Sequence, residues 1–313
     1  MWPLIKLLPA KTNFRYVKFA RPLWVLSLLL VIGSIALCVK PGLNFGIDFR
    51  GGTVLELTTP GRPLDLGRAR EALGALHMGD VQAQQFGDAS SAQVRFQTPV
   101  GSDPAQTVDR VRGVLRTSLG QDIRFTRTDV IGAKVSDELR NQGIMALLAA
   151  IILMMVYIWF RFEFRFGLGA VVALFHDVIL CFGLLALTRM EFSLTTVAGI
   201  LTVIGYSMND TVVVFDRIRE NLVKYKRMPM RELIDLSINE TFSRTMITGP
   251  TALMALAGLA VFGGEVLFSF SMILMFGLCV GTYSSIYIGA PLLLFWKRKE
   301  EAEPAAKPAT GRP

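Results

Sequence analysis

Six apolar windows, each long enough to cross a lipid bilayer as an α-helix, constrain the fold of this 313-residue chain more than any other feature. The chain is 52% hydrophobic, which is typical of a membrane protein. The windows cover residues 23–39, 143–160, 167–187, 192–214, 246–262 and 266–296. The last window exceeds one upright span, so we expect its helix to tilt, bend or extend past the bilayer. We predict a polytopic α-helical membrane protein with six transmembrane helices, the first of them an uncleaved helix.

The basic residues predict how these helices are oriented. Segment 40–142 contains 13 Lys and Arg against 12 Asp and Glu, the balance of a folded domain. Of the 20 other basic residues, only Arg189 lies on the same side of the membrane as this segment. Basic loops favour the cytoplasm, so we expect both termini inside and segment 40–142 outside. Because the charge borders membrane helices instead of forming one patch, the net charge of +8 does not indicate nucleic-acid binding.

Segment 40–142 has the pattern of a small α+β domain. Strands are expected at 45–58, 81–86, 92–98 and 123–130, and helices at 63–77 and 103–119. This βαββαβ order predicts a ferredoxin-like domain, one antiparallel sheet with two helices on one face. Gly51 and Gly52 interrupt the first strand, where we expect the backbone to bend or to approach another segment closely. Asp48 and Arg50 are interpreted as the solvated face of that strand or, equally, as a substrate contact.

The link between the fourth and fifth spans, residues 217–245, is first basic and then amphipathic. Pro229 suits a helix start, and Leu233, Leu236 and Phe242 would form the apolar side of that helix. We expect this helix to lie along the cytoplasmic membrane surface. The N-terminal segment 1–22 is expected in the cytoplasm, and the polar, Pro- and Ala-rich tail 297–313 is expected to be disordered.

A carboxylate, Asp210, lies within the fourth span. A charge at membrane depth is costly, by about 2.5–3.5 kcal/mol on insertion scales, so we expect it to bind or pass a proton or ion. Residues at spacings of four, three, four and four place it on one helical stripe, which we expect to face the bundle interior or a wet path. The stripe consists of Thr195, Gly199, Thr202, Tyr206 and Asp210. The alternative interpretation is a carboxylate that is hydrogen-bonded to a neighbouring helix for packing.

Three further polar residues are candidates for proton transfer. His176 and Asp177 lie near the middle of the third span. Adjacent helical residues point about 100° apart, so no tight pair between them is expected. His176 suits proton transfer near neutral pH, and a structural hydrogen-bonded pair is the alternative. Arg244, just before the fifth span, either extends to lipid phosphates or is the counter-charge to Asp210.

The sixth span carries small residues at every fourth position, a pattern that lets another helix approach closely, either from this chain or from a partner subunit. These residues are Gly277, Gly281, Ser285 and Gly289. The sequence contains no spacing typical of a metal site, a nucleotide-binding loop or a nucleophile with its base. We therefore expect no metal, no cofactor and no enzymatic activity. Any work would draw on an ion gradient or on the ATPase of a partner.

Several motifs resemble the SecF branch of the SecD/SecF family of protein-export membrane subunits, within the resistance-nodulation-division (RND) superfamily. The resemblance covers nearly the whole chain. Its clearest motif, FGIDFRGGT at residues 45–53, contains Gly46, Asp48, Arg50, Gly51 and Gly52. The other motifs are FRFEFRF at 160–166, His176-Asp177, VIGYSMNDTVVVFDRIREN at 203–221, SRT at 243–245 and the small-residue stripe.

The resemblance implies an accessory subunit of the Sec translocase in the cytoplasmic (inner) membrane, with segment 40–142 in the periplasm. It implies that SecYEG and SecA first move an unfolded preprotein, and that this chain with SecD then uses the proton motive force to complete translocation; YajC is a further implied partner. The Asp and Arg of the family's proton path fall on Asp210 and Arg244. It also implies half of an RND-type bundle and leaves the role of His176 and Asp177 open.

Two other functions remain as alternatives. An RND-type exporter of lipids or small molecules predicts two six-helix halves in one chain and larger outward domains than segment 40–142. A non-transporting scaffold that stabilises the translocon predicts that neutralising Asp210 leaves secretion intact, whereas a change in the small-residue stripe does not.

Overall fold

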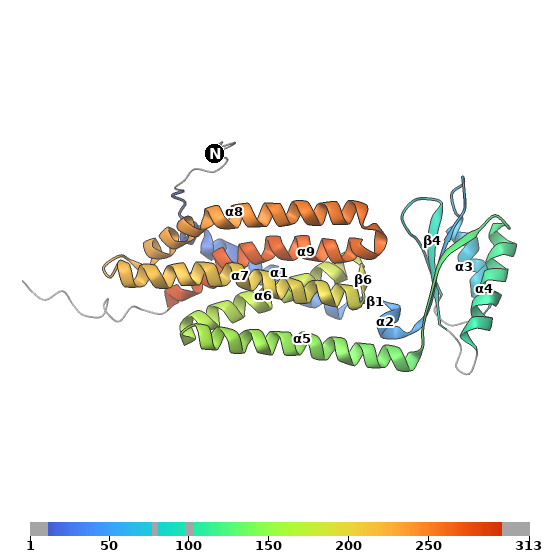
Figure 1. Cartoon of the computed structure of the whole chain (residues 1–313), viewed down its shortest axis with the longest axis horizontal. Helices are drawn as coiled ribbons and strands as arrows, with labels where there is room; N and C mark the ends of the chain where they lie inside the picture. The colour runs from blue at the N-terminus through green and yellow to red at the C-terminus, as the bar shows by residue number, and fades with distance from the viewer. Residues whose placement is uncertain (1–11, 77–80, 98–102, 296–313) are drawn as a thin grey trace, which may run out of the picture.

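The structure is a computed structural model that describes residues 12–76, 81–97 and 103–295. A helical bundle occupies one end of its long axis and a small domain the other (Figure 1). Within the described residues, six helices are long and apolar enough to span a membrane, as predicted. They are α1 (Tyr16–Val39), α5 (Ala133–Arg161), α6 (Phe164–Thr188), α7 (Leu194–Lys224), α8 (Met230–Phe262) and α9 (Gly264–Ser284) with its continuation.

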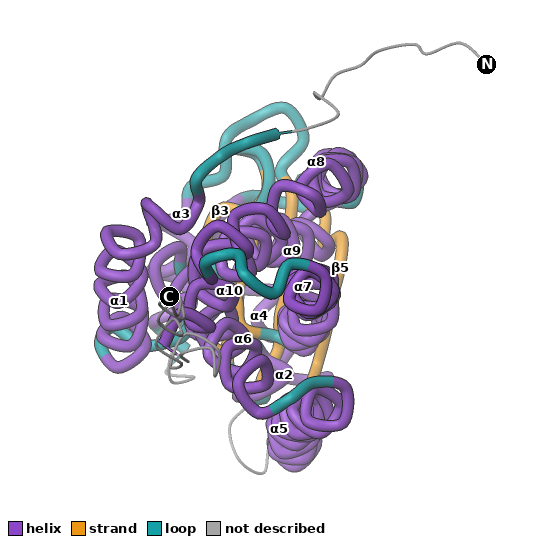
Figure 2. Tube along the Cα trace, turned by 90° about the vertical axis from the view of Figure 1, so that its left-hand side faces the viewer, coloured by secondary structure: helices purple, strands orange, loops and turns teal. Residues whose placement is uncertain are grey.

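Helices α6, α7 and α9 are the most buried of the six, and α1, α5 and α8 lie on the outside of the bundle (Figure 2). Leu174 of α6, Ile200 of α7 and Ile273 of α9 are almost fully buried. The outer helices leave most of their apolar side chains exposed. In a bilayer this exposure carries no hydrophobic penalty, because lipid tails are as apolar as the side chains.

The link between the fourth and fifth spans differs from the sequence-based expectation. Helix α7 continues to Lys224, and α8 begins at Met230 and runs unbroken to Phe262. The separate surface helix expected after Pro229 is therefore the first half of α8. Leu233, Ile234 and Ile238 are its buried apolar side, whereas Leu236 and Phe242 are only partly buried. This first half therefore packs against the bundle core.

The other span boundaries also extend beyond the apolar windows. Helix α1 begins at Tyr16, and α5 begins at Ala133, so no break separates domain and membrane helix at residue 142. Helix α9 is followed by a π-helical turn (Ser285–Gly289), α10 (Ala290–Leu292) and a 3-10 turn (Leu293–Phe295). The over-long last window is thus one irregular helix. The expectations for residues 1–11, residue 296 and the tail 297–313 lie outside the described residues.

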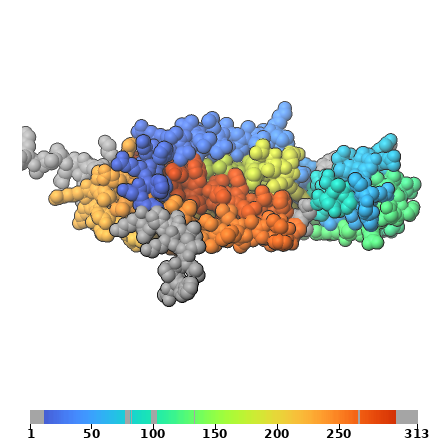
Figure 3. Space-filling model, turned by 90° about the horizontal axis from the view of Figure 1, so that it is seen from above, coloured from blue at the N-terminus to red at the C-terminus, as the bar shows by residue number. Residues whose placement is uncertain are grey.

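The small domain contains a four-stranded antiparallel sheet with the strand order β3-β4-β2-β5. Its elements are β2 (Gly52–Thr58), α3 (Leu66–Gly74), β3 (Gln82–Gln85), β4 (Ser91–Phe96), α4 (Pro104–Leu119) and β5 (Arg124–Ile131). Leu55, Val94, Leu73 and Leu115 belong to one core between the sheet and the two helices. Figure 3 shows the domain as a separate mass at the end of the bundle.

Segment 45–58 is not the single strand that its alternating pattern predicts. It consists of β1 (Asn44–Phe45), one helical turn α2 (Ile47–Arg50), a glycine bend and β2. Strand β1 pairs in parallel with β6 (Glu191–Phe192), between α6 and α7. Gly51 and Gly52 have φ of 70° and 123°, a backbone that glycine adopts without steric cost. Asp48 and Arg50 therefore lie on a helical turn and not on the face of a strand.

Candidate functional site

Asp210, the intramembrane carboxylate of α7, is buried within the bundle, with 6% of its surface exposed. Its Oδ2 accepts a hydrogen bond of 3.3 Å from Thr282 Oγ1 of α9. Arg244 of α8 is exposed, and no ion pair among the described residues joins it to Asp210. The guanidinium nevertheless interacts electrostatically with the carboxylate. Asp210 thus has a neutral donor in contact and a cation farther away, an arrangement in which gain or loss of a proton changes the attraction between α7 and α8.

The rest of the predicted polar stripe faces the bundle interior only in part. Thr195 and Thr202 are exposed and Tyr206 is half-buried, whereas Gly199 packs against α9. The inner face of α7 is a different row of residues: Thr196, Val203, Ser207 and Thr211. Helical periodicity groups residues on one stripe but does not say which stripe faces the core.

Asp177 of α6 is fully buried and is hydrogen-bonded to all three central helices. Its Oδ2 accepts hydrogen bonds from Ser207 Oγ of α7 and from Ser284 Oγ of α9, the latter at 2.8 Å. Its Oδ1 lies 2.9 Å from Nδ1 of the adjacent His176. The expectation that His176 and Asp177 cannot pair is therefore wrong, because their side chains turn toward each other although their Cβ atoms diverge. Ser284 was not among the residues singled out from the sequence.

His176 uses only one of its two ring nitrogens in this network. Its Nε2 is buried without a hydrogen-bond partner among the described residues. The ring lies 6.1 Å from that of Tyr283, centroid to centroid. The Tyr283 hydroxyl in turn donates to the Leu23 carbonyl at 3.0 Å and lies 2.8 Å from Ser27 Oγ. The polar centre therefore extends from α7 through α6 and α9 to α1.

The small-residue stripe of the last span packs against helices of this same chain. A Cβ on Gly277 would overlap Val203, and one on Gly281 would lie 2.7 Å from Ser207 Cβ. Ser285 Oγ lies 2.8 Å from Thr211 Oγ1, and Gly289 faces Gly169 and Phe215. The π-helical turn shifts the helical phase, so the stripe follows α7 first and then reaches α6. This close approach allows Thr282 and Ser284 to reach the two carboxylates.

Residues 46–52 form the joint between the small domain and the bundle. Asp48 Oδ2 accepts a hydrogen bond of 2.8 Å from the backbone N–H of Leu194, the first residue of α7. Phe49 is buried against Phe192, with ring centroids 5.2 Å apart, and faces Gly143 of α5. Gly52 is required because a Cβ there would lie 2.8 Å from the Phe96 carbonyl oxygen. Arg50 lies over the Phe45 ring, 5.8 Å from its centroid.

An ion pair fastens the domain sheet to this joint. Arg95 of β4 pairs with Glu191 of β6, and the Arg95 side chain is only 10% exposed. Gly46 leaves room for the Glu191 carboxylate, which a Cβ at that position would overlap. Burial raises the pKa of Glu191; Arg95 opposes this shift and Asp48 adds to it. The pair joins residues far apart in sequence, and no local pattern indicated it.

Among the described residues, no group of His, Cys, Asp and Glu side chains has the arrangement of a metal site. What this centre shows is hydrogen bonding from three neighbouring helices to two buried carboxylates, Asp177 and Asp210. Asp177 and Asp210 both contact α9. Asp210 lies on α7, whose first residue, Leu194, is hydrogen-bonded to Asp48 of the joint.

Comparison with known proteins finds relatives over nearly the whole chain. Residues 112–299 match the family model described as "Protein export membrane protein SecD/SecF, C-terminal", and residues 36–59 match "SecD/SecF GG Motif". The chain is similar to "Protein translocase subunit SecF" of Rickettsia bellii, with 41% identity over 96% of this chain and 98% of the relative. It is similarly related to the protein of that name from Rhodobacter capsulatus, with 42% identity over 97% of this chain and 96% of the relative.

A solved structure shares the fold of this chain. The crystal structure of SecDF, a translocon-associated membrane protein from Thermus thermophilus, matches with a TM-score of 0.82 and 32% identity. The match covers 95% of this chain and 39% of the SecDF chain, so this chain spans about two fifths of that protein. A second SecDF structure, in a super-membrane-facing form, matches with a TM-score of 0.69.

Proposed function

Because this chain belongs to the SecD/SecF family of protein-export membrane proteins, we propose that it is the SecF-type subunit that works with SecD and uses the proton motive force to complete preprotein translocation. It is a multi-pass membrane protein and a transport component of the Sec system. In this proposal SecYEG and SecA begin the translocation, YajC accompanies the complex, and no cofactor other than the proton gradient is needed.

The proposed location is the inner membrane, with both termini in the cytoplasm and the small domain in the periplasm. The excess of basic residues on one side supports this orientation.

We assign the small domain to the ferredoxin-like class. The support is its βαββαβ element order, its β3-β4-β2-β5 strand order and its single face of helices.

The observation that carries the proposal is that one helix connects the buried carboxylate to the joint. Asp210 lies 16 residues after Leu194 on α7, which is about 24 Å along a helix. Protonation of Asp210 removes its attraction to Arg244 and changes its bond to Thr282, so α7 shifts relative to α8 and α9. Asp48 and β6 transmit this shift to the domain. A charge that crosses 100 mV supplies about 2.3 kcal/mol, enough to bias such a movement.

The outer face of α7 is the surface that we assign to SecD. Thr195 and Thr202 are exposed there, beside a groove of about 520 Å³ between α5 and α7. Leu153 and Tyr157 of α5 and Gly205 and Asn209 of α7 belong to its lining. Thr202 Oγ1 donates to the Ala198 carbonyl within α7, but the exposed Asn209 amide in the groove is unfavourable against lipid, and a partner helix on this face would cover it.

A gradient-dependent secretion assay tests the proposal. Vesicles that contain SecYEG, SecA, SecD and this chain are compared with vesicles that carry Asp210→Asn or, as a matched control, Glu220→Gln on an exposed part of the same helix. We expect Asp210→Asn to abolish the gradient-stimulated fraction while the complex still assembles, and Glu220→Gln to retain it. Unchanged secretion with Asp210→Asn would support the scaffold alternative instead.

A further inference from the structure

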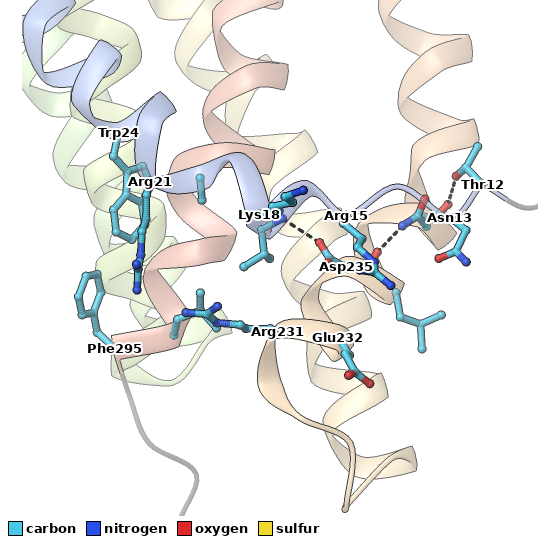
Figure 4. A pocket seen from close by; sticks show the side chains of 15 residues that line it. Thr12, Asn13, Arg15, Lys18, Arg21, Trp24, Arg231, Glu232, Asp235 and Phe295 are labelled. Atoms are coloured by element: carbon cyan, nitrogen blue, oxygen red, sulfur yellow. Dashed lines mark hydrogen bonds between the residues drawn. The ribbon is translucent and has the colours of Figure 1, made fainter.

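A hollow of about 910 Å³ lies where the beginning of α1, the beginning of α8 and the end of the last span meet (Figure 4). Arg15, Lys18 and Arg21 line it from the α1 side, and Arg231 lines it from α8. In the orientation proposed above, this end of the bundle faces the cytoplasm. The buried polar centre described above does not include any of these residues.

The charges around this hollow are unbalanced. Four basic side chains face two carboxylates, those of Glu232 and Asp235, which leaves a formal charge of +2. Asp235 is already engaged, since its Oδ1 accepts a hydrogen bond of 2.9 Å from the Val17 N–H and its charge interacts with Arg15.

The other three basic residues have no such counter-charge. None of the ion pairs among the described residues involves Lys18, Arg21 or Arg231. In Figure 4, Arg21 and Arg231 extend from two different helices toward the part of the hollow beside Phe295. Two helices thus present uncompensated cations to one space, which is an arrangement that suits an anion with several oxygen acceptors.

The side of the hollow toward the membrane is aromatic and apolar. Trp24, one helical turn beyond Arg21, stacks on Phe295 with ring centroids 5.4 Å apart. Its indole Nε1 donates a hydrogen bond of 2.6 Å to the Tyr287 carbonyl, which fixes the ring. Tryptophan at this position is typical of the level of lipid headgroups. Leu236 and Leu294 complete the apolar wall.

We propose that this hollow binds the phosphate of an anionic phospholipid from the cytoplasmic leaflet, with Arg21 and Arg231 at the phosphate, Lys18 farther along the hollow, and Trp24 and Phe295 against the glycerol and upper acyl region. Basic pockets between transmembrane helices on the cytoplasmic side bind such headgroups. The bound lipid bridges α1 and α8. The proposal rests on the orientation assigned under the proposed function, but its test does not require transport.

Lipid retention by the full chain is the test. Purified protein in neutral detergent is titrated with phosphatidylglycerol, with phosphatidylcholine of the same acyl chains, or with inorganic phosphate, and bound lipid is counted by native mass spectrometry. The pocket variant combines Lys18→Gln, Arg21→Gln and Arg231→Gln. A matched variant neutralises three basic residues outside the hollow: Arg219, Lys226 and Arg227.

We expect phosphatidylglycerol to bind in preference to phosphatidylcholine, and the pocket variant to lose at least about 10-fold in affinity while the matched variant keeps it. Equal binding of the two lipids, or equal losses in the two variants, would overturn the proposal. If inorganic phosphate displaces the lipid with an affinity equal to that of the lipid, the site belongs to a soluble phosphate, and the proposal is also overturned.

If the triple variant fails to fold, Arg231→Gln alone, compared with Arg231→Lys, gives the same distinction. Asp210→Asn is expected to bind lipid normally, so failure of this site and failure of proton coupling are separate results.

Discussion

Asp48 in the joint accepts a hydrogen bond from the backbone N–H of Leu194, and so the joint is bonded to the first turn of the helix that carries Asp210. The first N–H groups of a helix have no partner within the helix and need an external acceptor. A negative charge at this end is also favoured by the helix dipole. Movement of α7 along or about its axis must therefore either carry Asp48 with it or break this bond.

Replacing Asp48 tests the mechanical link. Asp48→Ala is expected to cost about 0.5–2 kcal/mol in the stability of the joint, as other lost helix caps do. Asp48→Asn retains an acceptor oxygen and should cost less. Hydrogen exchange at residues 194–197 measures the effect, and faster exchange in the alanine variant alone is the expected pattern. Equal exchange in all three proteins would show that Asp48 does not cap α7 in the membrane.

The Arg95–Glu191 pair predicts that docking of the domain depends on pH. Burial raises the pKa of Glu191 in the docked state, so protonation favours docking. The docked state is favoured most below the ordinary glutamate pKa, and this advantage is lost as the pH rises through the raised value. The exchange rate of the Gly46 N–H, which bonds to the Phe192 carbonyl, reports on joint opening once it is corrected for intrinsic rate.

Two variants separate the contributions to this pH dependence. Glu191→Gln should remove it, whereas Arg95→Gln should move it to higher pH, because Arg95 opposes the rise in the Glu191 pKa. A pH profile that persists in Glu191→Gln would assign the titration to another group.

The Asp177 network predicts a loss of stability rather than a specific loss of coupling. Asp177→Ala leaves the donors of Ser207, Ser284 and His176 without their acceptor, at about 1–3 kcal/mol for a buried unsatisfied group. Asp177→Asn keeps one acceptor oxygen and should be milder. Thermal unfolding in detergent, measured beside gradient-dependent secretion, distinguishes the roles. An asparagine variant of normal stability that has lost all gradient stimulation would instead make Asp177 a proton carrier.

Close packing of α9 on α7 predicts a strong contrast between two glycines. Gly281→Ala places a methyl group 2.7 Å from Ser207 Cβ and should cost about 1–3 kcal/mol, the range for overpacking. Gly258→Ala, in α8 with nothing within 4 Å of the added Cβ, should be neutral or slightly stabilising. Thermal unfolding of the two variants checks this prediction. Similar losses for both would contradict the close approach at Gly281.

The sequence predicted the membrane spans well, because a bilayer requires about 20 apolar residues in a helix. The sequence did not predict the features that depend on packing between distant segments. The alternation around Asp48 and Arg50 is typical of a strand, yet burial of Phe49 and the glycine bend produce a helical turn. The inward face of α7 depends on how α9 packs, so Gly199 and Asp210 of the predicted stripe face inward whereas Thr195 and Thr202 are exposed.

Contacts between distant segments were likewise beyond prediction. Arg95 and Glu191 meet only after the domain has docked on the bundle. Ser284 of α9 and Ser207 of α7 meet at Asp177 of α6 where Gly281 lets α9 pack closely on α7. Hydropathy identifies the helices, but side-chain volumes and loop geometry determine how they are placed.

The most direct test of the central claim is the distance between domain and bundle during proton flow. Spin labels at Thr117 of α4 and Phe262 of α8, which are both exposed, report this distance by double electron–electron resonance. The three native cysteines are first replaced by alanine. The protein is reconstituted with SecD, with and without a proton gradient. If protonation of Asp210 moves the domain through α7, the gradient changes the distance distribution of the otherwise unaltered chain and leaves that of Asp210→Asn unchanged. An identical gradient-dependent change in Asp210→Asn would contradict the account.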